Sequence, residues 1–260
     1  MTSVYRARDE LLKRRVAVKA LAQHLASDPH CLRQFRREAE LLAGLAHPLI
    51  VAVFDAGGAP RPFIVMELVP GVTTGALARE RRPPTCDQAV RIVAQAAEAL
   101  AFAHERDVIH RDVSPGNVLV RRFDGTAKLA DFGLASRAGE VAPHYTGDVA
   151  GTYGYMAPAV LRGETPSALS DLYSLGAVAH RLLAGPLEPR SAATANQASA
   201  CPRLRPLADV RHGLPASVAD VIDRALEHDP GARQSSVAEF RAQLLAADRR
   251  GPQLMRREAA

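Results

Sequence analysis

The segment HRDVSPGNVLV, residues 110–120, carries two side chains suited to metal and proton chemistry, Asp112 and Asn117. A third, Asp131, follows an apolar hairpin whose Asp-Gly turn lies at 124–125. A hairpin brings its two outer ends together, so we expect the three side chains to meet there. Carboxylate and amide oxygens are ligands that Mg²⁺ accepts while keeping positions for water and phosphate oxygens. The pattern therefore indicates a magnesium and phosphate site.

A lysine and a glutamate from two other elements are the partners such a site needs. The alternating run 14–21 predicts a strand, and its Lys19 emerges beside small alanines. The next segment, 27–47, predicts a helix begun by a Ser-Asp-Pro cap, with Glu38 at the edge of its apolar stripe. An inward-facing acid needs a cation, and Lys19 is the candidate. Taken singly, a turn acid or a strand lysine usually has no such role, but the order of these residues favours a nucleoside triphosphate site.

The remaining elements predict a small β-rich part followed by a helical part. Residues 62–71 indicate a buried strand that runs into a Pro-Gly turn, the expected joint between the parts. Helices are predicted over 85–104, where Thr85 and Gln88 have capping-box spacing, and over 167–185. Asp171, near the start of the second helix, is either a cap or a buried anchor for a neighbouring backbone.

Composition narrows the class of protein. The 260 residues are 47% hydrophobic with a formal charge of +5, but the basic residues include only three lysines and no basic run interleaved with aromatic residues. Nucleic-acid binding is therefore not expected. The three cysteines lack metal-ligand spacing and are expected to be reduced thiols. Neither a signal peptide nor a membrane span is evident, and we expect a cytoplasmic protein.

Five motifs in order, VAVK, HRDVSPGN, DFG, GTYGYMAP and SDLYSLG, resemble the eukaryotic-like serine/threonine protein kinases of bacteria. The resemblance runs from about residue 4 to about residue 245. It implies an α+β, bilobal protein kinase-like fold with a small, incomplete β-rich N-lobe at 1–68 and a larger helical C-lobe at 69–245. Residues 246–260 would then form a flexible tail.

The resemblance implies a role for each matching residue. The catalytic set comprises the base, the phosphate-binding lysine with its partner, and two hydroxyl residues: Asp112, Lys19, Glu38, Ser114 and Thr152. The set that binds ATP surrounds the adenine and the phosphates: Val4, Ala17, Lys19, Met66, Glu67, Val69 and Leu119. Asn117 and Asp131 would hold Mg²⁺, with Mn²⁺ as an alternative.

Regulation by phosphorylation is a further implication. Arg111, beside the base, suits a kinase that is switched by a phosphate on its activation segment, 131–158. Thr146 is the first candidate for that phosphate and Tyr145 the second, although an exposed hydroxyl without a role is an equal interpretation of Thr146.

Three departures from the family pattern bear on activity. The chain begins at the end of a glycine-rich loop, with Thr2 where the last glycine would fall, so ATP binding should be weaker and the first strand should have an open edge. We expect a misassigned start rather than a truncated kinase. Ser114 replaces a lysine that touches the transferred phosphate, which predicts a slower enzyme. Ala159 replaces a glutamate, which would leave Arg233 without its expected partner.

These departures keep three functions open. The first is ATP- and Mg²⁺-dependent phosphorylation of Ser/Thr hydroxyls on protein substrates, including autophosphorylation. The second is a pseudokinase that holds a protein partner. The third is a small-molecule phosphotransferase, which the peptide-platform pattern of GTYGYMAP disfavours. A homodimer through the N-lobe is left undecided, as are the substrate and the activating signal.

Overall fold

Alternating apolar residues build a four-stranded antiparallel sheet at the start of the chain. The computed structural model describes residues 2–58, 61–81, 83–138, 153–187 and 203–258, and only the backbone of Tyr153 and of residues 249–258. The strands are β1 (Thr2–Asp9), β2 (Arg14–Leu21), β3 (Val53–Gly57) and β4 (Phe63–Glu67), in the order β1-β2-β4-β3. β1 is an edge strand, as the sequence predicts, and β2 coincides with the strand predicted over 14–21.

One long helix, α1 (Pro29–Ala43), packs on this sheet. Asp28 caps it by accepting a hydrogen bond from the backbone N of His30, at 2.8 Å, and Pro29 occupies the first turn. The apolar stripe of α1 meets the sheet through Phe35, which packs with Leu21 and Ile64. This packing sets the rotation of α1, and so turns Glu38 inward, where it is only 5% exposed.

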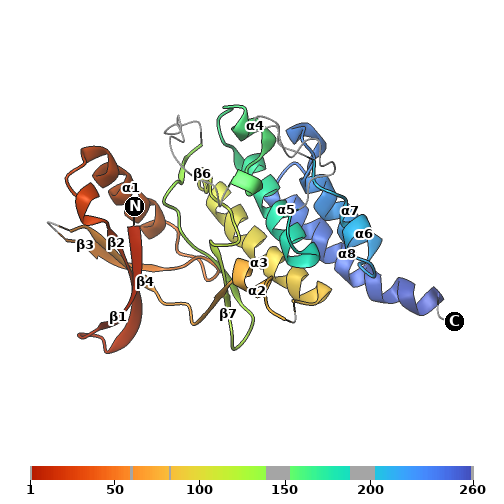
Figure 1. Ribbon diagram of the computed structural model, residues 1–260, viewed down its shortest axis with the longest axis horizontal. Coiled ribbons are helices and arrows are strands. Elements are labelled where there is room, and N and C mark those ends of the chain that lie inside the picture. Colours follow the sequence, from red (N-terminus) through yellow and green to blue (C-terminus); the bar gives the residue numbers. More distant parts are fainter. Residues whose placement is uncertain (1, 59–60, 82, 139–152, 188–202, 259–260) are drawn as a thin grey trace.

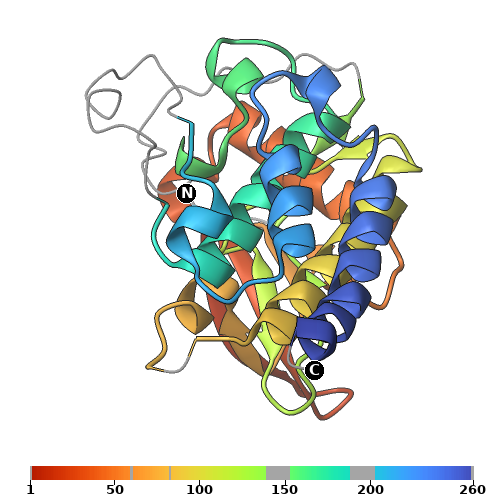
Figure 2. The same ribbon diagram turned by 90° about the vertical axis from the view of Figure 1, so that its right-hand side faces the viewer.

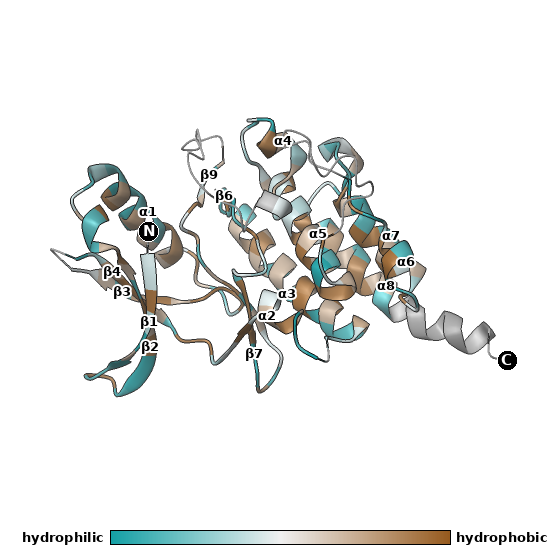
Figure 3. Cartoon of the chain, in the orientation of Figure 1, coloured by the Kyte–Doolittle hydropathy of each residue, from teal (hydrophilic) through white to brown (hydrophobic). Residues whose placement is uncertain are grey.

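The helical lobe surrounds the main core. Its longer helices are α3 (Cys86–His104), α5 (Ala168–Ala184), α7 (Ala216–Ala225) and α8 (Val237–Glu258). Shorter elements are α2 (Thr74–Leu77), α4 (Pro158–Leu161), α6 (Leu207–Val210) and the 3₁₀ turns η1 (Gln23–Leu25), η2 (Tyr153–Tyr155) and η4 (Pro230–Ala232). Figure 1 shows the sheet and α1 at one end of the molecule and this lobe at the other. Apolar residues gather on α3, α5 and α7 (Figure 3); α3 and α5 bury most of their circumference, whereas α7 buries one face.

The capping box predicted for α3 is present. The backbone N of Thr85 donates to the side chain of Gln88, and the backbone N of Gln88 donates to the Thr85 hydroxyl. α8 packs against α3, and Figure 2 shows the two helices side by side. The backbone of residues 246–258, which the sequence assigned to a tail, continues α8. No helix among the described segments is both long and apolar enough to cross a bilayer.

Short strands directly before α2 and between α3 and α4 carry the loops of interest. β5 (Gly71–Thr73), β7 (Val118–Arg121) and β8 (Ala127–Leu129) form a three-stranded antiparallel sheet, and β6 (Val108–Ile109) pairs with β9 (Ser136–Arg137). The predicted hairpin is therefore confirmed. Gly125, with φ of 72°, supplies the left-handed residue of its turn. The observed architecture is the α+β, bilobal one that the sequence predicts.

Candidate active site

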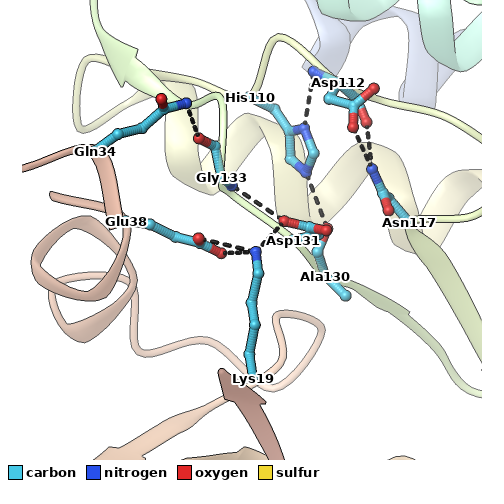
Figure 4. A network of polar contacts seen from close by, with 9 residues as sticks. All are labelled: Lys19, Gln34, Glu38, His110, Asp112, Asn117, Ala130, Asp131 and Gly133. Atoms are coloured by element: carbon cyan, nitrogen blue, oxygen red, sulfur yellow. Dashed lines mark hydrogen bonds and ion pairs between the residues drawn. The ribbon is translucent and has the colours of Figure 1, made fainter. Parts of the chain in front are cut away.

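Lys19 lies at the centre of a buried ionic cluster between the two lobes (Figure 4). Its Nζ is 2.7 and 2.8 Å from the two carboxylate oxygens of Glu38, and 2.7 Å from Oδ1 of Asp131. The lysine is supplied by β2, the glutamate by α1 and the aspartate by the loop after β8. The pairing of Lys19 with Glu38, predicted from the sequence, is confirmed.

Burial and the ionic contacts have opposite effects on the pKa values of the cluster. Burial disfavours a charged amine, but the carboxylates of Asp131 and Glu38 outweigh it and raise the pKa of Lys19. Burial raises the pKa of Glu38, a shift that Lys19 only partly offsets. For Asp131, whose side chain is 46% exposed, Lys19 outweighs burial and lowers the pKa. A site with one cation and two acids, one of them open to the cleft, can accept a further cation and phosphate oxygens.

The loop between β6 and β7 orients Asp112. Asn117 Nδ2 donates to both the backbone O and the carboxylate Oδ2 of Asp112, each at 2.8 Å. The backbone N of Asp112 lies 3.2 Å from Nδ1 of His110, and the other ring nitrogen of His110 lies 3.2 Å from the backbone O of Ala130 (Figure 4). If Nδ1 accepts, Nε2 carries the proton and donates, which is the neutral imidazole. The ring thus bridges the loop of Asp112 to the strand that leads to Asp131.

Asp171 is the buried anchor of this loop and not simply a helix cap. Its Oδ2 accepts from the backbone N of His110 at 2.8 Å, and its Oδ1 accepts from the backbone N of Arg111 at 2.9 Å. Nε2 of His104 lies 2.8 Å from the same Oδ2. The bonds from His104 and the His110 amide outweigh burial and lower the pKa of Asp171. Arg111 has φ of 67°, a left-handed conformation that costs a non-glycine residue about 1 kcal/mol, which the two amide bonds offset.

A model of the protein kinase domain matches residues 1–245 of this sequence. The chain belongs to the protein kinase family. It is 39% identical over 256 residues to serine/threonine-protein kinase PknB of Mycobacterium tuberculosis. The aligned region covers 94% of this chain and 40% of that protein. It is 40% identical over 260 residues to PknB of Mycolicibacterium smegmatis, with the same coverage, and 33% identical over 256 residues to PrkC of Bacillus subtilis, with 95% and 38% covered. The chain thus spans about two fifths of the length of these relatives.

The side chains of this kinase domain that were predicted to hold a metal fit Mg²⁺ chemically. Lys19 and Gly133 both donate to Oδ1 of Asp131, which leaves the rest of this half-exposed carboxylate accessible. Asn117 uses Nδ2 toward Asp112, so its Oδ1 is the atom that can coordinate a cation. A backbone bond of 2.8 Å from Ala130 N to Asn117 O holds the two segments together. The metal role of the pair stays a prediction.

The predicted nucleotide-binding residues lie along the joint between the lobes. Ala17 pairs with Met66 across β2 and β4, and Glu67 ends β4 at the start of the connection to the helical lobe. Leu119 lies on β7, and Val4, on β1 opposite Lys19, is 62% exposed. These positions agree with a site between the lobes, while the contacts of Val69 and the others with a nucleotide stay predictions. Thr152 and Thr146 lie outside the described residues.

Ser114 belongs to the same loop as Asp112. It is 8% exposed, and its backbone O accepts from the backbone N of Asn117 at 3.0 Å. The loop is further fixed through Pro115, whose carbonyl accepts from the Thr74 hydroxyl at 3.1 Å and from the backbone N of Gly75 at 3.0 Å. Sequence reasoning missed Thr74, because a threonine near a Pro-Gly turn gives no sign of a partner 41 residues away.

Arg233, which lacks its expected glutamate partner because position 159 is an alanine, is held by other groups. Its guanidinium donates to the backbone carbonyls of Glu227 and Leu169, both at 2.7 Å, and lies 4.9 Å from the ring centre of Tyr173. Arg233 is 2% exposed, so these groups replace water around the charge. A sequence does not show which backbone carbonyls converge on a side chain, so these substitute partners of Arg233 could not be predicted, and the effect of Ala159 on stability stays a prediction.

A basic cavity lies between α1 and the segment that follows Asp131. It has a volume of about 250 Å³, and its lining includes Arg33, Arg37 and Arg111, with Glu38 as its one acidic residue. Gln34 closes one side by donating to the carbonyl of Gly133 at 3.0 Å (Figure 4). The sequence pointed to Arg111 but not to the two α1 arginines, which share one face of the helix with four-residue spacing.

Proposed function

We propose that this chain transfers the terminal phosphoryl group of ATP to serine and threonine hydroxyls of proteins. The observation that carries the proposal is the joint presence, at one cleft, of the Lys19–Glu38–Asp131 cluster and the Asp112–Asn117 pair. Relatives named serine/threonine-protein kinases, 33 to 40% identical over most of this chain, support the same substrate class.

The chemistry assigned to these residues is positioning and proton transfer. Asp112, held by Asn117, accepts a hydrogen bond from the substrate hydroxyl and takes its proton as the oxygen bonds to phosphorus. The bond from that phosphorus to the bridging oxygen breaks, and ADP leaves. Lys19 binds phosphate oxygens, and Glu38 keeps its ammonium group in place. Mg²⁺, when bound by Asn117 and Asp131, neutralises charge on the phosphates.

The adenine would bind between the lobes. Ala17 is 7% exposed on β2, and a small side chain there leaves room for a flat ring against the strand. Leu119 would contact the opposite face of the ring, with Val4 beside it, and the backbone from Glu67 to Val69 would bind its edge. Met66 would line the back of the site.

Regulation by a phosphate on the activation segment is supported by the basic cavity. Arg33, Arg37 and Arg111 bring three guanidinium groups to one cavity of about 250 Å³, a suitable environment for a phosphate dianion. Because α1 also carries Glu38, a phosphate bound to its arginines would hold that helix in the position that pairs with Lys19. We assign Thr146 as the first candidate for this phosphate.

Incubation of the protein with Mg²⁺ and ATP, followed by phosphopeptide mapping, tests both parts of the proposal. We expect phosphate on hydroxyls of residues 139–152, with Thr146 the main site, and none in the Asp112→Asn variant. Phosphate elsewhere only would contradict the regulatory part. Its absence from the chain and from an added protein substrate would contradict the kinase itself.

The pseudokinase alternative is favoured by one observation, the serine at position 114 in place of a cation. Nucleotide binding does not separate the two functions, because a pseudokinase can keep it. Phosphoryl transfer does: a folded chain that binds nucleotide and transfers nothing would be a pseudokinase.

A further inference from the structure

Lys128 is a buried lysine that the proposed mechanism leaves without a role. It lies on β8, in an apolar strand, and is 8% exposed. Of the three lysines in the sequence, Lys13 lies on an exposed turn and Lys19 binds in the ionic cluster. A buried lysine is costly unless it is paired, so its partner identifies its role.

The partner of Lys128 is Glu67, the last residue of β4. Nζ of Lys128 lies 2.7 Å from Oε2 of Glu67, and their side chains are 10% and 22% exposed. The same carboxylate oxygen lies 3.4 Å from the backbone N of Ala52, while the backbone N of Glu67 donates to the carbonyl of Ala52 at 2.8 Å. Glu67 is thus held at both its backbone and its side chain.

The pair joins two lobes at the point where a nucleotide base would bind. Glu67 begins the connection from the small sheet to the helical lobe, whereas Lys128 lies on a strand of the helical lobe, opposite Leu119 in the β7–β8 register. Residues that face each other in an antiparallel pair project to the same side. The chain then runs from Lys128 through two residues to Asp131, so β8 carries the contact to the connection and leads directly into the loop of the phosphate-side acid.

Other bonds make β8 a fixed support. The backbone N of Leu129 donates to the carbonyl of Leu49 at 2.8 Å, and its carbonyl accepts from Val51 N at 2.9 Å. Leu129 itself is fully buried in the main core. The ammonium group extends from a strand whose backbone is held on both sides, so its ion pair gives the Glu67 carboxylate a defined position.

We propose that Lys128 is a positioning residue that fixes, through Glu67, the backbone that binds the adenine edge. This inference rests on the proposed ATP-dependent function. Without the lysine, the connection would sample more conformations, and nucleotide would bind only to the fraction in the right one. The affinity for nucleotide should therefore fall, while the rate of the chemical step should stay the same.

Steady-state kinetics of Lys128→Met test the proposal. We expect the KM for ATP and the Kd for ADP to rise about tenfold while kcat changes less than twofold, because the reacting groups are untouched. Arg122→Met is the matched control: Arg122 pairs at 3.1 Å with Glu80 in an exposed bridge, and its loss should leave both constants unchanged. Glu67→Gln, which keeps the shape of the partner, should repeat the effect of Lys128→Met, and the two changes together should be no worse than either alone.

Hydrogen exchange of the nucleotide-free protein gives a readout that needs no catalysis. Amides of residues 66–69 should exchange several-fold faster in Lys128→Met than in the wild type, with the exchange of α5 unchanged. A wild type without nucleotide binding would overturn the proposed function, and exchange would still decide the role of Lys128. Unchanged exchange, an unchanged KM in folded variants, or a fall in kcat at constant KM would overturn the positioning role.

Discussion

Lys19 Nζ lies 2.7 Å from Oδ1 of Asp131, although the two residues are 112 positions apart in the chain. One comes from the second strand of the small sheet and the other from the loop after β8, so this contact joins the two lobes at the centre of the cleft. The residue that holds Lys19 from the opposite side, Glu38, comes from α1. A movement of α1, β2 or the loop would therefore alter the contacts among all three charged side chains.

Replacement of Lys19 by methionine should abolish phosphoryl transfer and weaken the fold. Glu38, 5% exposed, would remain as a buried acid without its cation, which costs about 3 kcal/mol in comparable cases. We expect transfer to fall at least a hundredfold and the melting temperature to fall by several degrees. Lys13→Met, at an exposed lysine, is the control for loss of charge. If Lys19→Met kept activity within threefold of the wild type, Lys19 would have no essential role in phosphoryl transfer.

Replacement of Ser114 by lysine should accelerate transfer. One preorganised donor at a reacting phosphate is worth about 3 kcal/mol, and the serine hydroxyl already supplies part of it. We therefore expect kcat to rise about tenfold. Ser114→Met has a similar length without the charge and should give no gain. A lysine variant that is folded and no faster than the methionine variant would show that position 114 does not contact the phosphate.

Replacement of Ala159 by glutamate should not stabilise the protein. Arg233 already donates to carbonyls of Glu227 and Leu169, and Ala159 is 6% exposed, so a new carboxylate would be buried at a cost. We expect Ala159→Glu to melt no higher than Ala159→Gln, which has the same shape without charge. A glutamate variant that melts several degrees above the glutamine variant would show that an ion pair between position 159 and Arg233 stabilises the protein.

Asp223 should make stability depend on pH between about 4 and about 6. Burial, together with the nearby Asp220, Asp209 and Glu227, raises its pKa to about 6, against the backbone amide of Leu207, which lowers it. The folded state then binds a proton more tightly than the unfolded state, so the free energy of unfolding falls as pH rises through this window. Because Asp223 is only partly buried, we expect the effect to be about 1 kcal/mol.

Asp223→Asn is the test of that dependence. It keeps an acceptor for the Leu207 amide, at 3.1 to 3.2 Å in the wild type, and removes the charge. Urea unfolding at pH 4 and pH 7.5 should show the variant equal to the wild type at the lower pH and more stable at the higher. Equal stabilities of the variant and the wild type at both pH values would mean that burial does not destabilise the charged carboxylate.

Much of the fold, and one contact of the candidate site, could be predicted because they follow from local patterns. The alternation at 14–21, the Asp-Pro start of α1 and the capping box of α3 each depend on residues within one element. The Lys19–Glu38 pair followed from two such patterns and from the cost of burying an acid without a cation.

Contacts that depend on tertiary packing were not predictable. The ligands of Arg233 are backbone carbonyls, which every residue offers, and the partner of Thr74 is the carbonyl of Pro115. The partner of Lys128 is Glu67, 61 positions away on a strand of the four-stranded sheet, and only the packing of the two lobes brings them together. Arg33 and Arg37 form a cavity only because α1 lies over the segment after Asp131.

The central claim is that the cluster at Lys19 and the pair at Asp112 transfer phosphate to protein hydroxyls. The most direct measurement is the initial rate at which γ-labelled ATP, with Mg²⁺, labels a serine- and threonine-containing protein, compared with the Asp112→Asn variant. We predict label on serine and threonine, at a rate at least a hundredfold lower in the variant. Equal labelling by both proteins, or no labelling by a folded wild type that binds nucleotide, would contradict the account.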